Sequence, residues 1–285
     1  MPLTTPVSTG PIGVFDSGIG GLTVVAALRE LLPAEDIFYL GDTARVPYGG
    51  KARQTIERYT LEIAELLLAE GAKAIVVACN TATALAIPKL QEIVPVPSVG
   101  VIMPGAAAAA AVTRNGRVGV MGTRATIASG AYERALRDCR PDLEVHVLAC
   151  PLLVPLVEEG WLDDPVTDQV VGRYLTPLLA AGIDTLVLGC THYPFVRESI
   201  ARFLGPGITI VDSARNCALA TREMLSANGL AAPADQRGSL QVALTDPSGE
   251  FLKVAERRLG LGIRDVLVRS VVAANKTEEP RISSE

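Results

Sequence analysis

The sequence predicts an α/β fold with mostly parallel sheets. Short apolar runs alternate along the chain with amphipathic or alanine-rich segments, the order typical of strand–helix–strand units. Several of these runs have apolar residues at consecutive positions, as strands buried on both faces do. A weak internal repeat further indicates that the chain contains two similar halves.

Eight apolar runs are expected to form strands, and the segments between them to supply the helices. The clearest helix is predicted over Lys51–Glu70, where Ile56, Ile63 and Leu67 fall on one side. The strands are expected at Ile12–Phe15, Ile37–Leu40, Ala74–Ala78, Val99–Ile102, Val118–Met121, Leu143–Leu148, Thr185–Leu188 and Ile208–Val211.

The internal repeat involves two pairs of segments. Residues Gly71–Cys79 share the pattern Gly-x-x-x-apolar-apolar-x-x-Cys with residues Gly182–Cys190. At nearly the same separation along the chain, Ile12–Ser17 resembles Val118–Thr123. Two similar α/β halves would explain both matches, and chance similarity between hydrophobic strands is the alternative.

Composition excludes several classes of protein. The 285 residues are 49% apolar and 20% charged, which is typical of a globular chain with one or two domains. A net charge of −5 provides no basic excess, so nucleic acid is not expected as a primary partner. The longest weakly polar stretch, Val99–Val112, contains Pro104 and Gly105 and is shorter than a membrane span.

Cysteine and histidine usage indicates reduced thiols and no metal. Met1–Gly10 has neither the charged nor the apolar region of a signal peptide, so we expect a cytoplasmic protein. Five cysteines is an odd number, and none are paired by spacing. With only His146 and His192 and no Cys-x-x-Cys, a structural metal site is not expected.

Cys79 and Cys190 occupy matching positions. Each follows a predicted buried strand and precedes a predicted helix start, at the strand end where open α/β sheets bind ligands. A helix N-terminus favours the thiolate over the thiol, so either protonation state should be accessible near neutral pH. Two thiols facing each other across a small substrate would form the acid/base pair that inversion of a stereocentre needs. A buried cysteine acting as a small hydrophobe is the alternative for each, whereas Cys139, Cys150 and Cys217 are expected to be structural.

A glycine-rich turn follows the first strand. Asp16-Ser17-Gly18-Ile19-Gly20-Gly21 would expose backbone N–H groups to an anion, but it lacks the third glycine of the dinucleotide fingerprint. We therefore expect neither a nicotinamide nor a flavin cofactor. Asp16 could hydrogen-bond a thiol or a substrate amine, or could serve as a helix N-cap.

Polar residues next to the two cysteines are further candidates. Asn80-Thr81 and Thr191-His192 offer amide, hydroxyl and imidazole groups suited to a carboxylate and an ammonium, although either threonine could be an N-cap. His192 could orient or protonate the Cys190 thiol. His146, inside an apolar run, is expected to be a core residue. The turn Pro47–Gly50 is expected near the site, and spacing alone favours Glu158 as a solvated helix end.

Together these motifs resemble bacterial glutamate racemases, members of the aspartate/glutamate racemase family. The resemblance runs in order from about Ile12 to Asp212. The motifs that carry it are Phe15-Asp16-Ser17-Gly18, Gly41-Asp42-Thr43, Pro47-Tyr48-Gly49, Val77-Ala78-Cys79-Asn80-Thr81, Gly122-Thr123 and Gly189-Cys190-Thr191-His192-Tyr193-Pro194.

The resemblance implies cofactor-independent interconversion of L- and D-glutamate, supplying D-glutamate for peptidoglycan. It implies two similar domains with the active site in the cleft between them: residues 1–98 with 212–285, carrying Cys79, and residues 99–211, carrying Cys190. It assigns proton transfer to the two thiols, with Asp16 supporting Cys79, and with Glu158 and His192 supporting Cys190. The residues it assigns to substrate binding are Asp16, Ser17, Tyr48, Gly49, Asn80, Thr81, Thr123, Thr191 and His192.

Partners and alternatives follow from the same resemblance. Glutamate is the expected small-molecule partner, no membrane partner is expected, and a homodimer is left open. Four lysines are expected to be solvated, so none of these is expected to bind pyridoxal phosphate: Lys51, Lys73, Lys89 and Lys253. An aspartate racemase or related two-cysteine isomerase is one alternative. A non-catalytic amino-acid-binding protein, with the thiols as core or redox residues, is another.

Overall fold

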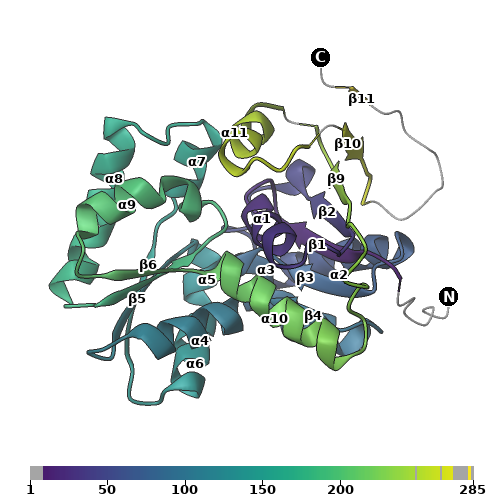
Figure 1. The fold of residues 1–285 in the computed structure, drawn as a ribbon. Helices are drawn as coiled ribbons and strands as arrows, with labels where there is room; N and C mark the ends of the chain where they lie inside the picture. The colour runs from purple at the N-terminus through teal and green to yellow at the C-terminus, as the bar shows by residue number, and fades with distance from the viewer. Residues whose placement is uncertain (1–8, 248, 264, 272–281, 284–285) are drawn as a thin grey trace.

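Two α/β bodies lie side by side in the computed structural model, with helix α10 (Ser213–Ala227) running between them (Figure 1). The structure describes residues 9–247, 249–263, 265–271 and 282–283. Most of Met1–Gly10, on which the signal-peptide expectation depends, lies outside the described residues. Helix α10 packs against α1 (Leu22–Leu31) of one body and α4 (Ile102–Val112) of the other, so it joins the two.

The first body contains a seven-stranded sheet in the order β11-β10-β9-β2-β1-β3-β4. All neighbouring strands are parallel except β10 and β11. The strands are β1 (Ile12–Asp16), β2 (Ile37–Gly41), β3 (Ala74–Val77), β4 (Ser98–Gly100), β9 (Leu240–Leu244), β10 (Asp265–Val268) and β11 (Ile282–Ser283).

The second body contains a four-stranded, fully parallel sheet in the order β6-β5-β7-β8. Its strands are β5 (Arg117–Gly122), β6 (Glu144–Ala149), β7 (Thr185–Gly189) and β8 (Thr209–Asp212). This order repeats the order β2-β1-β3-β4 of the first sheet, with β1 matching β5 and β3 matching β7. The internal repeat in the sequence therefore reflects two similar halves.

Helices cover both faces of each sheet. In the first sheet, Val14 and Val76 point to a core shared with α1 and α10, whereas Phe15 and Val77 point to α2 and α3. The remaining helices are α1 (Leu22–Leu31), α2 (Arg53–Ala69), α3 (Asn80–Ile93), α4 (Ile102–Val112), α5 (Arg124–Ala128), α6 (Ala131–Cys139), α7 (Leu153–Glu158), α8 (Pro165–Ala180), α9 (Arg197–Leu204), α11 (Gly249–Leu259), and the 3₁₀ turns η1 (Thr43–Arg45) and η2 (Tyr193–Val196).

The eight predicted strands are all present, and the parallel α/β fold is confirmed. Strand β4 is shorter than expected, because α4 begins at Ile102, inside the run predicted as a strand. The strands β9, β10 and β11 were not predicted. The division into residues 1–98 with 212–285 and residues 99–211 remains a proposal. Strand β4 of the first sheet and strand β8 of the second bracket that division.

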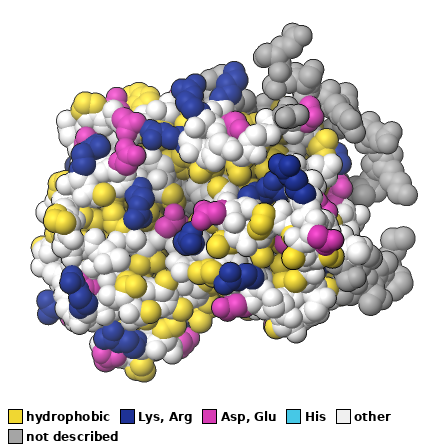
Figure 2. Space-filling view, viewed as in Figure 1, with side chains coloured by type: hydrophobic (Ala, Val, Ile, Leu, Met, Phe, Trp, Pro, Cys, Tyr) yellow, Lys and Arg dark blue, Asp and Glu magenta, His cyan; other side chains and the backbone are white. Residues whose placement is uncertain are grey.

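Two residues are placed differently from the sequence prediction. Lys73 is buried, not solvated, and its Nζ lies 2.6 Å from Glu35 Oε2 in a buried ion pair. His146 is not a core residue: β6 is an edge strand, and 27% of the His146 side chain is exposed beside Glu144. Among the described residues, no helix is both long enough and apolar enough to cross a membrane. On the face shown in Figure 2, Lys and Arg side chains are interspersed with Asp and Glu.

Candidate active site

A cavity of about 220 Å³ lies between the two bodies, at the carboxyl ends of strands β1, β3, β5 and β7. Both bodies contribute to its walls, and both Cys79 and Cys190 are among the lining residues. The residues predicted for the site that line it are Ser17, Tyr48, Gly49, Cys79, Asn80, Thr81, Thr123, Glu158, Cys190, Thr191 and His192. The sequence therefore predicted most of the walls of this cavity.

Cys79 is the N-cap residue of helix α3. Its Sγ accepts a hydrogen bond from the backbone N–H of Ala82 at 3.5 Å, and its thiol donates to Ser17 Oγ at 3.6 Å. The sulfur itself caps the helix, so neither Thr81 nor Asn80 does. Burial, and then the nearby carboxylate of Asp16, raise the pKa of the Cys79 thiol to about 12. The expectation that the helix terminus would hold this thiol near neutral is wrong, because burial outweighs it.

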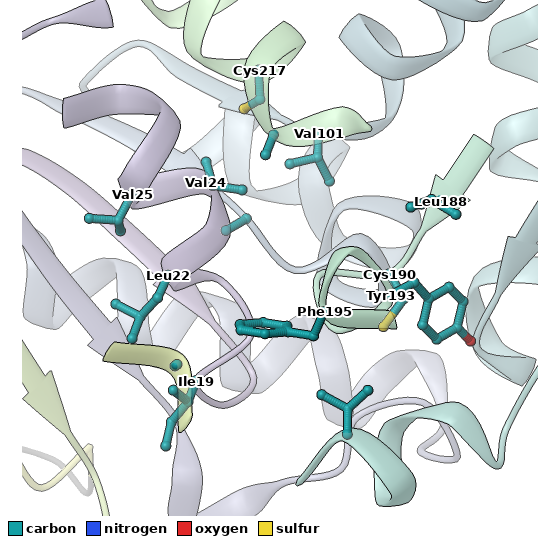
Figure 3. Close-up of a cluster of buried hydrophobic side chains, with 14 of the residues drawn as sticks. Ile19, Leu22, Val24, Val25, Val101, Leu188, Cys190, Tyr193, Phe195 and Cys217 are labelled. Atoms are coloured by element: carbon teal, nitrogen blue, oxygen red, sulfur yellow. The ribbon is translucent and has the colours of Figure 1, made fainter. Parts of the chain in front are cut away.

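Cys190 lies at the end of β7 and is buried. No α-helix begins directly after it: the chain enters the 3₁₀ turn η2, and α9 starts only at Arg197. The ring nitrogen Nδ1 of His192 lies 3.9 Å from Cys190 Sγ. Phe195 points from η2 toward Leu22 of α1, while Tyr193 points the opposite way (Figure 3). The turn that follows Cys190 is thus packed on both sides by the same hydrophobic core.

His192 and Glu158 form a pair at the cavity wall. His192 Nε2 lies 3.0 Å from Glu158 Oε1, so Glu158 is not the solvated helix end that spacing alone favoured. Burial alone would lower the pKa of His192, but hydrogen bonds to Cys190 and Glu158 raise it to about 10. The imidazole is therefore protonated at neutral pH and places a positive charge beside Cys190.

Replacing Glu158 with glutamine is expected to make the protein less stable up to about pH 7, with the loss shrinking as the pH rises through about 10. Folded His192 keeps its proton up to about pH 10, whereas unfolded histidine loses it near pH 6.5. The stability it contributes is complete below about pH 6.5 and falls by about 1.4 kcal/mol per pH unit as the pH rises toward 10. Glu158 is a third exposed, so its loss should cost roughly 1 kcal/mol.

Urea denaturation at pH 5, 7 and 9 measures this effect. The matched control is Glu159→Gln, which removes an exposed carboxylate one residue away and should change the unfolding free energy little. Equal losses in the two variants at pH 7 would show that Glu158 does not hold the His192 proton.

Asp16 lies beneath the cavity and is fully buried; it is not among the lining residues. Its Oδ2 accepts the backbone N–H groups of Gly18 and Gly21 at 3.1 Å, and its Oδ1 accepts the Thr191 hydroxyl at 3.3 Å. The last bond joins the two bodies. The structure thus does not bring Asp16 to the position of a substrate ligand, and Asp16 does not cap α1, whose N-cap is Gly21.

The glycines of the first turn permit this close approach of the two bodies. A Cβ on Gly20 would lie 2.6 Å from His192 Nδ1, closer than real Cβ contacts come. On the other side of the cavity, Thr81 Oγ1 lies 3.0 Å from Thr123 Oγ1, and the N–H of Ala125 donates to the carbonyl of Gly49 at 3.0 Å. The walls of the cavity are therefore tied together by direct contacts.

Tyr48 lines the cavity with a buried ring, and its hydroxyl donates to Asp42 Oδ2. Arg45 Nε donates to the same carboxylate at 2.7 Å, which fixes the turn before Gly49. Because the Tyr48 hydroxyl donates its one hydrogen to Asp42, it can face a ligand only as an acceptor.

Some cavity residues were not predicted. They are Val46, Pro47, Gly50, Arg124, Pro151, Val154 and Pro155. Pro47 and Gly50 belong to a turn that was expected near the site, and Arg124 directly follows Thr123. Cys150, which is expected to be structural, also follows a strand, β6, as Cys79 and Cys190 follow theirs. Its thiol donates to the Leu148 carbonyl at 3.6 Å, and burial raises its pKa to about 12.

Comparison with known proteins identifies the family. Residues 12–221 match the Asp/Glu/hydantoin racemase family. The chain belongs to this family. It is 48% identical over 262 residues to the glutamate racemase of Geobacter metallireducens, covering 92% of this chain and 97% of that protein. It is 49% identical to the glutamate racemase of Syntrophus aciditrophicus over 90% of this chain and 95% of that one.

Solved structures of glutamate racemases also superpose on this chain. The glutamate racemase isoform RacE1 of Bacillus anthracis superposes with a TM-score of 0.87 at 40% identity, covering 94% of this chain and 99% of that one. The glutamate racemase of Francisella tularensis, solved in complex with D-glutamate, gives a TM-score of 0.87 at 36% identity over 94% and 100% of the two chains. The arrangement of two similar α/β bodies is thus that of solved racemases.

Proposed function

We propose that this chain is a cofactor-independent glutamate racemase. It interconverts L- and D-glutamate by proton transfer at Cα and supplies D-glutamate for peptidoglycan in the cytoplasm. The observation that carries this proposal is the placement of Cys79 and Cys190 on one cavity, each at the end of the matching strand of its own body. Relatives that are nearly half identical over almost the whole chain bear the name glutamate racemase.

The two thiols act as a pair of opposite protonation state. One thiolate removes the α-proton of the bound amino acid, and the opposite thiol delivers a proton to the other face of the carbon. The configuration at Cα is inverted, and each sulfur ends in the state from which its partner began. The enzyme is then ready for the reverse reaction. No redox change or covalent adduct is needed.

Burial makes the Cys79 thiolate a strong base. An α-proton of an amino acid is very weakly acidic, and a thiol with its pKa raised to about 12 yields a thiolate better able to remove it. On the other side of the cavity, the protonated His192 places a positive charge 3.9 Å from the Cys190 sulfur. The same positive charge stabilises negative charge that develops on the substrate.

Polar groups around the thiols suit a dicarboxylic amino acid. The wall carries the hydroxyls of Ser17, Thr81 and Thr123 and the carboxamide of Asn80. Arg124 and His192 are the cationic side chains of the lining, and both suit the net negative charge of glutamate. The Francisella tularensis relative, whose fold this chain shares, was solved with D-glutamate bound.

Aspartate is the alternative substrate, shorter by one methylene. The aspartate racemase of Picrophilus torridus is 19% identical to this chain with a TM-score of 0.51, a likeness that extends to the fold alone. We therefore expect glutamate to be racemised at least tenfold faster than aspartate, since one misplaced methylene costs about 1–3 kcal/mol.

Loss of optical rotation with each of L-glutamate, D-glutamate, L-aspartate and D-aspartate measures this preference. Turnover of glutamate in both directions supports the proposal. Faster turnover of aspartate would show that aspartate, not glutamate, is the preferred substrate. Calorimetric binding of glutamate with no turnover of either amino acid would indicate a non-catalytic binding protein.

A further inference from the structure

Behind the cavity, one tyrosine hydroxyl joins three separate parts of the chain. Tyr132, in helix α6, is 2% exposed and does not line the cavity. Its hydroxyl donates to Asn80 Oδ1 at 2.7 Å and lies 3.2 Å from Ser213 Oγ. Asn80 directly follows Cys79 and belongs to the first body, whereas Ser213 is the first residue of α10, where the chain leaves the second sheet.

The ring of Tyr132 also approaches the strand that carries the second thiol. A Cβ placed on Gly189, the residue before Cys190, would lie 3.0 Å from Tyr132 Cε2. Tyr132 therefore packs against the backbone that positions Cys190 and holds the side chain that follows Cys79. Ser213 is similarly confined, because its Oγ would lie 2.6 Å from a Cβ on Gly105 of α4.

The direction of the hydrogen bonds decides what Asn80 can offer a ligand. A phenol carries one hydrogen, which Tyr132 donates to Asn80 Oδ1, so the Ser213 hydroxyl donates to the phenol oxygen. With its carbonyl oxygen engaged, Asn80 presents its amide nitrogen, a donor only, to the cavity it lines. A donor suits a carboxylate and does not suit an ammonium.

We propose that Tyr132 is a positioning residue for the reaction, which acts by fixing the Asn80 carboxamide so that its N–H groups face a carboxylate of the substrate. This inference rests on the proposed function and assigns Asn80 to the carboxylate side of glutamate. Without the Tyr132 hydroxyl, the carboxamide is free to rotate and to turn its oxygen toward the substrate, where it would repel the same carboxylate.

The test is a double-mutant cycle with Tyr132→Phe, Asn80→Ala and the double variant. We expect Tyr132→Phe to lower kcat/KM for glutamate about tenfold, the size of one hydrogen bond to a charged group. In the Asn80→Ala background, the same change should have almost no further effect, because the group through which Tyr132 acts is absent. A merely structural role would lower activity equally in both backgrounds, and that additivity would overturn the proposal.

Ser213→Ala is the matched control. It removes the other hydrogen bond of the Tyr132 hydroxyl but leaves the bond to Asn80, so kcat/KM should stay within about twofold of the original. A tenfold loss in Ser213→Ala with none in Tyr132→Phe would contradict the assignment.

The same double-mutant cycle is also carried out with the dissociation constant of D-glutamate, measured by calorimetry. This second measurement needs no turnover. If the original protein binds glutamate without racemising it, the proposed function fails while the coupling of Tyr132 to Asn80 is still read from binding. If the protein racemises glutamate and Tyr132→Phe is indistinguishable from it in both readouts, the proposed function stands and the role of Tyr132 is rejected.

Discussion

Replacing either Cys79 or Cys190 with serine is expected to lower kcat for glutamate racemisation by about 10²–10⁴. A serine hydroxyl is a far poorer acid and base than a thiol, so it can neither remove the α-proton nor return one at a useful rate. Both substitutions keep the shape of the cavity. Binding of glutamate should therefore change little, and the loss should appear in kcat rather than in affinity.

Cys217→Ala is the matched control for these variants. Cys217 is fully buried in α10, and burial raises the pKa of its thiol to about 12, as for Cys79. It does not line the cavity, so its removal should leave kcat within about twofold. Rates are followed by circular dichroism from each enantiomer, with binding followed by calorimetry. Unchanged rates in either serine variant would contradict the two-thiol proposal.

Replacing Asp16 with asparagine is expected to lower the rate about 10- to 100-fold, with little loss of glutamate affinity. The Asp16 carboxylate, second only to burial, raises the pKa of the Cys79 thiol. Without that charge the thiol pKa falls, and the thiolate becomes a weaker base. Asparagine is nearly the same shape, and its carbonyl oxygen can still accept the N–H groups of Gly18 and Gly21.

The pH dependence of Cys79 alkylation measures this fall in the pKa of the Cys79 thiol. With Cys190 replaced by serine in both proteins, the alkylation profile of the Asp16→Asn variant should shift to lower pH than that of its parent. The control is Asp142→Asn, which removes an exposed carboxylate that does not line the cavity and should leave the profile in place. An unchanged profile in Asp16→Asn would show that this carboxylate does not set the basicity of Cys79.

The sequence predicted the fold well because strands and helices of an α/β fold follow from the local spacing of apolar residues. Short runs rich in apolar residues marked every strand from β1 to β8. The repeated Gly-x-x-x-apolar-apolar-x-x-Cys pattern marked equivalent strands of the two sheets. Strands β9 and β10 also carry three consecutive apolar residues each, at 242–244 and 266–268, but both lie after the internal repeat and were not predicted. Strand β11 is only two residues long, too short to leave a pattern.

The site was harder to predict wherever a residue acts through a distant partner. Cys79 and Cys190 stand out because each ends a strand, but Glu158 becomes informative only when the fold brings it to His192. The predictions for Lys73 and Cys79 failed because the sequence does not show which side chains the fold buries. Lys73 is buried because Glu35 pairs with it, and Cys79 has a raised pKa because the fold buries its sulfur. Neither environment is encoded in neighbouring residues.

In the proposed mechanism, two sulfur atoms reach one carbon from opposite faces. Racemisation in D₂O, sampled early from each pure enantiomer and analysed by NMR for hydrogen at Cα, tests it most directly. Two bases predict that the newly formed enantiomer carries deuterium while the remaining starting enantiomer keeps protium, in both directions. Product that retains the original hydrogen, or equal deuterium in both enantiomers from the outset, would show that one base serves both faces.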